Sequence, residues 1–449
     1  MKVALVVPPL RAFNNFRMPT GLMCLAASLR QARPGDEIVI IDECAPDDMQ
    51  LDRAGLAAVS QRIVEKILGF GPDLAAFTAT TPDFYHVNAI AESLKKRQPD
   101  LITLVGGPHA TLRPREFFEH CRAMDFVLTG EGDLLFPEFV NALEAGADLP
   151  GCGVWRREKG RIIEGEHPER IANLDSLPLP AYDLIDMKRY AAPNVKSIRP
   201  LLLSSVAVFS SRGCPYNCKF CASISVWGRR VRFFNPIRVV DEIQMLKENY
   251  NIAAFFFFDD SFTVNKKHLG AVCSELMRRK INLPWGCQTR VDVVDDQVCE
   301  TIRQAGCIQL EFGVEAGNER GWRSLGKNIN SLQVEMAFDS ARRHGLRTLV
   351  NFMVNIPGET GQDLDDTCNL IRRIRPTIGI TNILTPYPGT PFAEERGGVP
   401  IEDYESLTMM EYGRFISFLE SKWRVARHSL ALDAAARKLN LAMRLSYRR

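Results

Sequence analysis

The chain of 449 residues lacks the features that mark several classes of protein. The uncharged stretch that begins at Pro200 is only a dozen residues long, several of them serines, and is too short for a membrane-spanning helix. The chain also has almost no excess of one sign of charge, with 56 Lys and Arg against 54 Asp and Glu. This near balance disfavours a general binder of nucleic acid or anionic lipid. The first residues enter a strand-like segment rather than a secretory signal. We therefore expect a cytoplasmic protein with a small-molecule partner.

The glycine-rich motifs of the common nucleotide-binding sheets are absent as well. The first predicted strand is followed by Pro8-Pro9-Leu10-Arg11, which contains neither G-x-G-x-x-G nor the lysine of a P-loop. This excludes the usual ways of binding NAD or ATP.

Cysteine is too thinly spread for the disulfide framework of a small secreted protein, with 12 residues over the whole chain. Nine are scattered, most of them in apolar patterns typical of buried small hydrophobic residues. These nine are Cys24, Cys44, Cys121, Cys152, Cys273, Cys287, Cys299, Cys307 and Cys368. The other three, Cys214, Cys218 and Cys221, lie within eight residues of one another.

The first part of the chain alternates short apolar runs with helix-length amphipathic segments, which indicates α/β structure. Strands are predicted at residues 3–7, 38–42, 74–78, 102–107 and 126–132. This alternation predicts βαβ units and a Rossmann-like parallel sheet over residues 1–147, covered on both faces. In such open sheets ligands bind outside the carboxyl ends of the strands.

A second alternation follows a proline-rich stretch, residues 148–198, which we interpret as a linker. Six strands are predicted there, at residues 207–211, 254–260, 285–290, 308–315, 346–356 and 379–386. Helical segments are predicted between them, at residues 236–250, 266–280 and 331–344. Six βα units are too few to close an eight-stranded barrel, so the pattern predicts a partial (β/α)6 TIM barrel over residues 199–395. Residues 396–449 lack strand signal and are predicted to be a short helical segment.

The three grouped cysteines follow the first strand of the second alternation directly, so one loop can present all three thiols. A structural zinc ion would need a fourth ligand, and no cysteine or histidine occurs between Cys221 and His268. Three thiolates on a four-iron cluster leave one iron open to a small molecule. A non-catalytic iron–sulfur carrier or redox sensor is the second hypothesis, although such a protein ordinarily supplies four ligands. A third interpretation is that the three thiols are simply packed in the protein and bind no metal.

The spacing of Cys214, Cys218 and Cys221, with Phe220 before the last, resembles the signature of the radical S-adenosylmethionine (SAM) superfamily. The resemblance implies a [4Fe–4S] cluster held by the three cysteines, SAM chelated to the open iron, and release of a 5′-deoxyadenosyl radical. It also implies an external electron donor of the flavodoxin or ferredoxin type.

The ends of the next predicted strands resemble the SAM-binding segments of the same family. The resemblance implies that Asp259 and Asp260 bind the amino group of SAM. Their alternative role is to cap the following helix, which Ser261 or Asn265 could equally do.

Further along, Arg290 would pair with the SAM carboxylate and Glu315 with the ribose hydroxyls, since a guanidinium matches a carboxylate and an ionised Glu accepts two hydroxyl donors. The alternative is an internal ion pair between Arg290 and Glu315. Asn351 and Tyr387 fall in segments that resemble those lining the adenosine pocket.

The first domain resembles the cobalamin-binding domain of B12-dependent radical SAM enzymes, through residues 19–22, 105–111 and 128–133. The resemblance implies a corrin on the carboxyl edge of this sheet, between the two domains. The implied contacts are Thr78, Thr80, Thr81, Gly106, Gly107, Pro108, His109, Glu131 and Gly132.

One departure concerns the cobalt ligand. The aspartate-x-histidine-x-x-glycine motif is missing, and residues 83–86 do not restore it. This implies either cobalamin without a histidine on cobalt or a degenerate domain that binds no corrin.

The resemblance implies a cobalamin-dependent methyltransferase that acts at an unactivated carbon of a small molecule or natural product. The alternatives are a cyclase, a ring-rearranging or an oxidative enzyme with the same cofactors, and a cobalamin-independent radical SAM enzyme.

Overall fold

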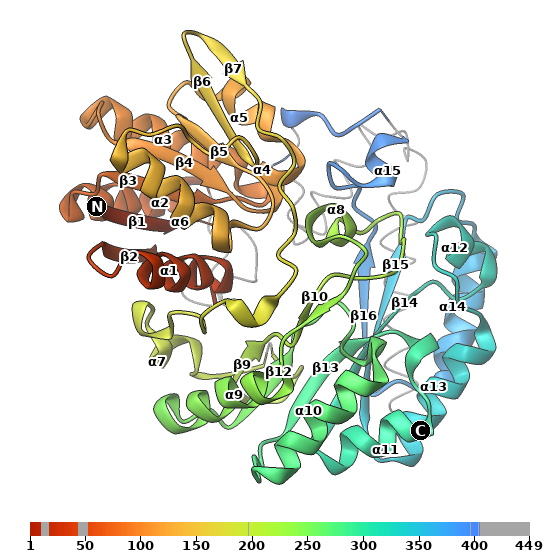
Figure 1. Ribbon diagram of the computed structural model, residues 1–449. Coiled ribbons are helices and arrows are strands. Elements are labelled where there is room, and N and C mark those ends of the chain that lie inside the picture. Colours follow the sequence, from red (N-terminus) through yellow and green to blue (C-terminus); the bar gives the residue numbers. More distant parts are fainter. Residues whose placement is uncertain (10–17, 44–52, 196, 396, 403, 405–449) are drawn as a thin grey trace. The chain divides into compact units, whose positions relative to one another are not determined.

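The computed structural model describes residues 1–9, 18–43, 53–195, 197–395, 397–402 and 404 (Figure 1). Contacts divide the chain into two compact units. The first comprises Met1–Met187, Ser225–Trp227 and Pro386–Glu411, and the second comprises Lys188–Ile224, Gly228–Thr385 and Tyr412–Arg449. Within the described ranges, no helix combines the length and the apolarity that a membrane span requires.

The first unit is built on one sheet. Five parallel strands come first, β1 (Lys2–Val7), β2 (Glu37–Asp42), β3 (Leu74–Thr78), β4 (Ile102–Gly106) and β5 (Phe126–Leu128). An antiparallel hairpin, β6 (Val154–Glu158) and β7 (Arg161–Ile163), extends it to the order β2-β1-β3-β4-β5-β6-β7. The order reverses between β1 and β3, and the carboxyl edge at such a reversal is where open α/β sheets bind ligands.

Helices cover both faces of this sheet. The helices α1 (Thr20–Ala32) and α6 (Gly132–Ala145) pack together, and α3 (Phe84–Arg97) packs against both α2 (Arg53–Phe70) and α5 (Pro114–His120). The short helix α4 (Pro108–Leu112) follows β4, and α15 (Pro391–Glu394) lies in the last segment of the unit. The helix α7 (Met187–Tyr190) begins at the last residue of the first segment, and its other residues belong to the second unit. The Rossmann-like parallel sheet predicted from the sequence is confirmed.

Two predicted strands of this sheet are too long. The strand predicted at 102–107 ends at Gly106, because Gly107 turns the chain with a φ of 93°. The strand predicted at 126–132 ends at Leu128, because Gly130 has a φ of 78° and α6 begins at Gly132. The stretch predicted as a linker also contributes structure, since it supplies the hairpin β6–β7 to the sheet.

The second unit is built on a curled sheet. Six strands are parallel, β9 (Leu203–Val208), β12 (Ala254–Phe257), β13 (Trp285–Thr289), β14 (Cys307–Glu315), β15 (Arg347–Val354) and β16 (Ile378–Ile383). The two-residue β8 (Pro193–Asn194) adds antiparallel to β9. The parallel strands lie side by side in chain order, as the predicted partial barrel requires.

The helices of the second unit lie on the outer side of the curled sheet (Figure 1). They are α9 (Pro236–Tyr250), α10 (Lys266–Arg278), α11 (Asp296–Gln304), α12 (Glu319–Ser324), α13 (Ser331–Arg343) and α14 (Gly361–Ile374). A small ribbon of β10 (Ser211–Arg212) and β11 (Arg232–Phe233) is separate from the main sheet, and α8 (Ser223–Trp227) lies between its strands in the chain.

Strand boundaries in this unit also differ from the predictions. The strand predicted at 254–260 ends at Phe257, since Asp259 leaves the sheet to accept hydrogen bonds from Ser210 and Ser211. The strand predicted at 207–211 begins at Leu203 and ends at Val208. The helical segment predicted for 396–449 lies outside the described residues, apart from residues 397–402 and 404.

Side chains alternate between the two faces of the curled sheet. On β14, Phe312 is fully buried towards the outer helices, with its ring centroid 4.8 Å from that of Phe338 on α13. Glu311 and Gly313 therefore face the concave side. The register shifts between Gly313 and Glu315, but the Glu315 carboxylate lies where a Cβ on Gly313 would be, so it is on the same side. The parallel register aligns Gly313 with Asn351 of β15. The concave wall thus carries polar groups as it approaches the carboxyl ends of the strands.

The scattered cysteines largely follow the prediction of buried small residues. Cys121, Cys273, Cys287, Cys299, Cys307 and Cys368 are buried. Cys24 is half-buried and Cys152 is exposed, so these two do not fit it. Cys44 lies outside the described residues.

Candidate functional site

The three grouped cysteines lie on one loop between β10 and α8, in a stretch without helix or strand. Gly213 starts the loop with a φ of 105°, and a Cβ there would lie 2.7 Å from the Arg230 carbonyl oxygen. The amide of Cys214 donates a hydrogen bond of 3.2 Å to the Gly228 carbonyl oxygen. Glycine is therefore needed for the chain to pass this close to its neighbour. All three thiols are free and half-buried.

The thiols of this loop lie close enough to influence one another. Burial raises the pKa of Cys221 to about 12 and also raises that of Cys214, and the neighbouring Cys218 and Asp260 raise both further. Thiolates in this loop thus need a positive group to offset their burial and mutual repulsion.

The donor set fits an iron–sulfur cluster better than a single zinc ion. Within the described ranges, no three His, Cys, Asp or Glu side chains converge as ligands of one metal ion. A zinc ion would draw its sulfur ligands to about 2.3 Å. A four-iron cluster is larger, because each thiolate binds a different iron.

Asp259 and Asp260 connect the end of β12 to the cysteine loop. Asp259 is buried and accepts hydrogen bonds from the Ser210 amide (3.1 Å) and from the Ser211 hydroxyl; its burial raises its pKa to about 6. Asp260 accepts a hydrogen bond of 2.6 Å from the Ser223 hydroxyl. The first aspartate thus fixes the backbone that leads into the loop, and the second holds the residue that follows it.

The alternative role of these aspartates, capping the following helix, is carried out by another residue. Asn265 Oδ1 accepts a 3.0 Å hydrogen bond from the His268 amide and caps α10. Ser261 makes no such side-chain cap.

Arg290, at the end of β13, reaches the cysteine loop. Its Nη1 lies 3.7 Å from Cys218 Sγ, and its guanidinium carbon lies 3.6 Å from the ring centroid of Tyr216. Asp292 accepts two hydrogen bonds from the same guanidinium, at 2.9 and 3.0 Å. A buried arginine is thus held between a carboxylate, an aromatic ring and a thiol.

Glu315, at the end of β14, forms a different pair from the one considered in the sequence. Its Oε1 lies 3.3 Å from Lys327 Nζ, and Arg290 pairs with Asp292, so Arg290 and Glu315 do not form the internal ion pair. Both Glu315 and Lys327 are buried, and Glu315 Oε2 has no hydrogen-bond partner. Burial raises the pKa of Glu315, while Lys327 acts to lower it. A buried carboxylate oxygen without a donor is suited to a ligand hydroxyl.

The remaining candidates for SAM contacts are more dispersed. Asn351 lies on the concave wall, where its Oδ1 accepts a 3.4 Å hydrogen bond from the side-chain Nδ2 of Asn382 on β16. Phe220 is half-buried on the cysteine loop. Tyr387 belongs to the first unit, and burial raises its pKa to about 12.

Several residues predicted to contact cobalamin already have partners within the first unit. The Thr80 hydroxyl and amide donate to Asp83 Oδ2, at 2.6 and 2.8 Å. Glu131 Oε2 accepts a 2.8 Å hydrogen bond from the Ile171 amide. The residues that stay at least partly exposed along the carboxyl edge are Thr78, Thr80, Gly106, Gly107, Pro108 and Gly132.

His109 is fully buried. Its Nδ1 lies 3.2 Å from the Thr81 hydroxyl, and its Nε2 lies 3.4 Å from Glu116 Oε2. The rings of Phe84 and Tyr404 meet it edge to face, with centroids at 5.3 and 5.0 Å. The histidine is thus enclosed by side chains of its own unit.

Packing within the sheet itself explains why a glycine occupies position 107. A Cβ at this position would lie 2.7 Å from Thr78 Oγ1 and 2.9 Å from the Ala79 amide nitrogen. Gly106 differs, because the nearest atom to its Cβ would be the Leu128 carbonyl oxygen at 3.6 Å.

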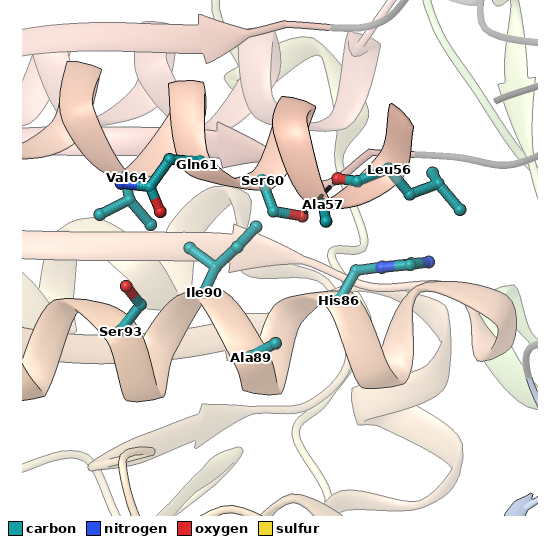
Figure 2. A pocket seen from close by; sticks show the side chains of 9 residues that line it. All are labelled: Leu56, Ala57, Ser60, Gln61, Val64, His86, Ala89, Ile90 and Ser93. Atoms are coloured by element: carbon teal, nitrogen blue, oxygen red, sulfur yellow. Dashed lines mark hydrogen bonds between the residues drawn. The ribbon is translucent and has the colours of Figure 1, made fainter. Parts of the chain in front are cut away.

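A separate groove of about 310 Å³ lies between α2 and α3 (Figure 2). It is lined by Leu56, Ala57, Ser60, Gln61, Val64, His86, Ala89, Ile90 and Ser93. Figure 2 shows Ser60 turned back to its own helix, where its hydroxyl donates to the Leu56 carbonyl at 2.9 Å. The groove includes none of the residues predicted to bind SAM or cobalamin.

Sequence reasoning missed the partners that hold the candidate residues. Lys327 is 12 residues from Glu315, and Tyr216 is far from Arg290 in the chain, so no local pattern marks either contact. The pairing of Arg290 with Asp292 could have been predicted, since an Arg-x-Asp spacing at the end of a strand is visible in the sequence.

Comparisons with known proteins agree with this geometry. The family model of the radical SAM superfamily matches residues 208–371, and that of the B12 binding domain matches residues 11–140. An uncharacterized methyltransferase of Pyrococcus horikoshii is 32% identical over 87% of this chain and 82% of its own length. The anaerobic magnesium-protoporphyrin IX monomethyl ester cyclase of Rubrivivax gelatinosus is 27% identical over 77% of this chain, which spans 62% of that relative.

A solved structure shows the same fold. The radical SAM methyltransferase TsrM from Kitasatospora setae, with cobalamin and a [4Fe–4S] cluster bound, superposes with a TM-score of 0.69 at 18% identity. The match covers 88% of this chain and 78% of that chain. The chain therefore belongs to the radical SAM enzymes that carry a B12-binding domain. The cofactors of this class are a [4Fe–4S] cluster, SAM and cobalamin.

Proposed function

We propose that the enzyme transfers a methyl group to an unactivated carbon of a small molecule. The observation that carries the proposal is the presence, on one chain, of a three-cysteine loop at the carboxyl end of a half-barrel and of a B12-binding sheet. The methyltransferase from Pyrococcus horikoshii, which matches along most of both chains, supports it.

In this proposal Cys214, Cys218 and Cys221 hold the cluster, which leaves one iron for the amino and carboxylate groups of SAM. Asp259 keeps the backbone before the loop in place through Ser210. Phe220 lies beside the ligands as part of the same loop.

The other SAM contacts lie on the half-barrel. Glu315 is placed to accept a ribose hydroxyl through its unpartnered Oε2. Asp260 and Asn351 supply further polar contacts. Tyr387 is also proposed to contact the adenosine.

The proposed cobalamin contacts are the half-exposed Thr78, Gly106 and Gly107, together with the exposed Pro108. When bound, the cluster supplies an electron to SAM, and cobalamin supplies a transferable methyl group. The chain binds and orients these groups, and its concave wall shields the reacting carbon from water. The buried His109 is not proposed as a cobalt ligand.

Cyclisation or oxidative chemistry is the second candidate. The cyclase of Rubrivivax gelatinosus favours it, because it aligns with 77% of this chain. The two candidates share their first half, the cleavage of SAM, and differ in the fate of the substrate radical.

We further propose a one-electron donor of the flavodoxin or ferredoxin type and a reducing, cytoplasmic compartment. Buried cysteines that form no disulfide support the latter, namely Cys121, Cys273, Cys287, Cys299 and Cys307.

Anaerobic reconstitution with iron, sulfide and hydroxocobalamin tests the proposal. The reduced enzyme should convert SAM to 5′-deoxyadenosine and should retain cobalamin through gel filtration. Absence of 5′-deoxyadenosine from an enzyme with four irons would contradict radical chemistry. Cleavage of SAM without bound corrin would contradict methyl transfer from cobalamin and leave a cobalamin-independent radical SAM enzyme.

A further inference from the structure

We infer that Arg290 acts on the iron–sulfur cluster itself: its guanidinium donates to the sulfur of Cys218 and makes the cluster easier to reduce. The inference rests on the proposed ligation of the cluster by Cys218. It departs from the sequence-based role of Arg290, which was to pair with the carboxylate of SAM.

The geometry carries this assignment. Nη1 of Arg290 lies 3.7 Å from Cys218 Sγ, within the range of a hydrogen bond to sulfur. The side chain is buried, so its charge is poorly screened by water. The cation thus acts directly on one of the three proposed ligands.

Two neighbours keep the guanidinium at the sulfur. Asp292 binds it through a fork of two hydrogen bonds, and Tyr216 lies under its face at 3.6 Å. Tyr216 belongs to the cysteine loop, two residues before Cys218, so the arginine and the loop are fixed to each other. With Nε and Nη2 engaged by Asp292, Nη1 is the nitrogen turned to the thiol.

The chemical consequence concerns one electron. A reduced one-electron carrier gives an electron to the oxidised [4Fe–4S]²⁺ cluster, which becomes [4Fe–4S]⁺, and no proton or bond is exchanged. The reduced cluster carries one more negative charge. Hydrogen bonds and positive charge at the cysteine sulfurs stabilise it and raise the reduction potential.

The test is the midpoint potential of the reconstituted holoenzyme without SAM, measured by redox titration and electron paramagnetic resonance. Arg290→Gln should reduce the equilibrium constant for reduction about tenfold, which equals a potential about 59 mV lower. Asp292→Asn should shift the potential in the opposite direction, because it removes a negative charge from the same cluster of side chains. Arg303→Gln is the matched control: this exposed arginine lies near the end of α11, and it should leave the potential unchanged.

The outcomes separate the inference from the proposed function. If Arg290→Gln holds four irons at an unchanged potential, the inference is overturned, and weaker SAM binding in that variant would restore the carboxylate role. If Arg290→Gln cannot hold the cluster, Asp292→Asn decides: an upward shift supports the inference and an unchanged potential overturns it. A wild-type protein that assembles no four-iron cluster would contradict the proposed function instead.

Discussion

Glu315 and Lys327 form a buried ion pair that leaves half of the carboxylate unused. Lys327 Nζ lies 3.3 Å from Glu315 Oε1, while Oε2 is buried without a donor. Gly313 leaves the space for this pair, because a Cβ there would lie 2.4 Å from Glu315 Oε1. The lysine thus favours the charged form of the carboxylate and holds it in place, with the second oxygen ready to accept a hydrogen bond.

Replacing Lys327 by Met should destabilise the protein by about 3 kcal/mol, since it leaves a buried carboxylate unpaired. The pKa of Glu315 is already raised, and it should rise further in the variant. The loss should therefore be small at acid pH, where Glu315 is protonated, and should grow as the pH rises through its folded-state pKa. Urea unfolding at several pH values measures this.

The double variant Lys327→Met/Glu315→Gln is the control for that prediction. It removes the charge together with its partner and should recover most of the stability. A double variant as unstable as the single one would show that packing, not charge, is what Lys327 provides.

Any one of Cys214→Ala, Cys218→Ala and Cys221→Ala should abolish both the visible absorbance of the cluster and the cleavage of SAM, because each removes a thiolate from iron. Cys368→Ala, which alters a buried cysteine on α14, should retain both. Iron content and 5′-deoxyadenosine yield are the measurements. Four irons and normal cleavage in a triad variant would disprove the ligand set.

Asp83 should make the stability of the first unit depend on pH. Burial raises its pKa from 3.8 to about 7, so the folded state binds a proton more tightly than the unfolded state does. The free energy of unfolding should therefore fall as the pH rises towards 7, by up to about 1.4 kcal/mol per pH unit. Asp83→Asn should flatten this dependence in urea unfolding between about pH 4 and about pH 7. The same slope in Asp83→Asn and in the exposed control Glu92→Gln would assign it to other groups.

Gly106, rather than Gly107, offers the clean test of the corrin edge. Gly107→Ala should destabilise the unit by more than about 1 kcal/mol, because its positive φ and its contact with Thr78 both exclude a Cβ. Gly106→Leu meets no such obstacle at Cβ and should fold. It should nevertheless lose cobalamin if the ring lies on this edge. Visible spectra after reconstitution with hydroxocobalamin check this, and full retention of the corrin would place the ring elsewhere.

Much of this architecture could be predicted from the sequence, because hydrophobic periodicity and motif spacing are local properties. The two βα alternations and the cysteine loop are examples. The fate of polar side chains could not be predicted, since it depends on contacts between distant segments. His109 was predicted to contact the corrin beside Gly107, and in the structure it is enclosed by Tyr404 and Phe84. Arg290 was predicted to pair with the SAM carboxylate, with an ion pair to Glu315 as the alternative, and in the structure it pairs with Asp292.

The order of strands in the second sheet has a consequence for how the chain folds. From β9 to β16 each main strand pairs with the one made just before it, so every new βα unit finds its neighbour already present during synthesis. The first sheet differs, because β3 must pair with β1 after β2 has taken the other side. The cysteine loop, which follows β9 and β10 in the chain, is therefore made early, while Arg290 and Glu315 come with later strands. The proposed iron ligands would be available on the nascent chain before the residues that enclose them.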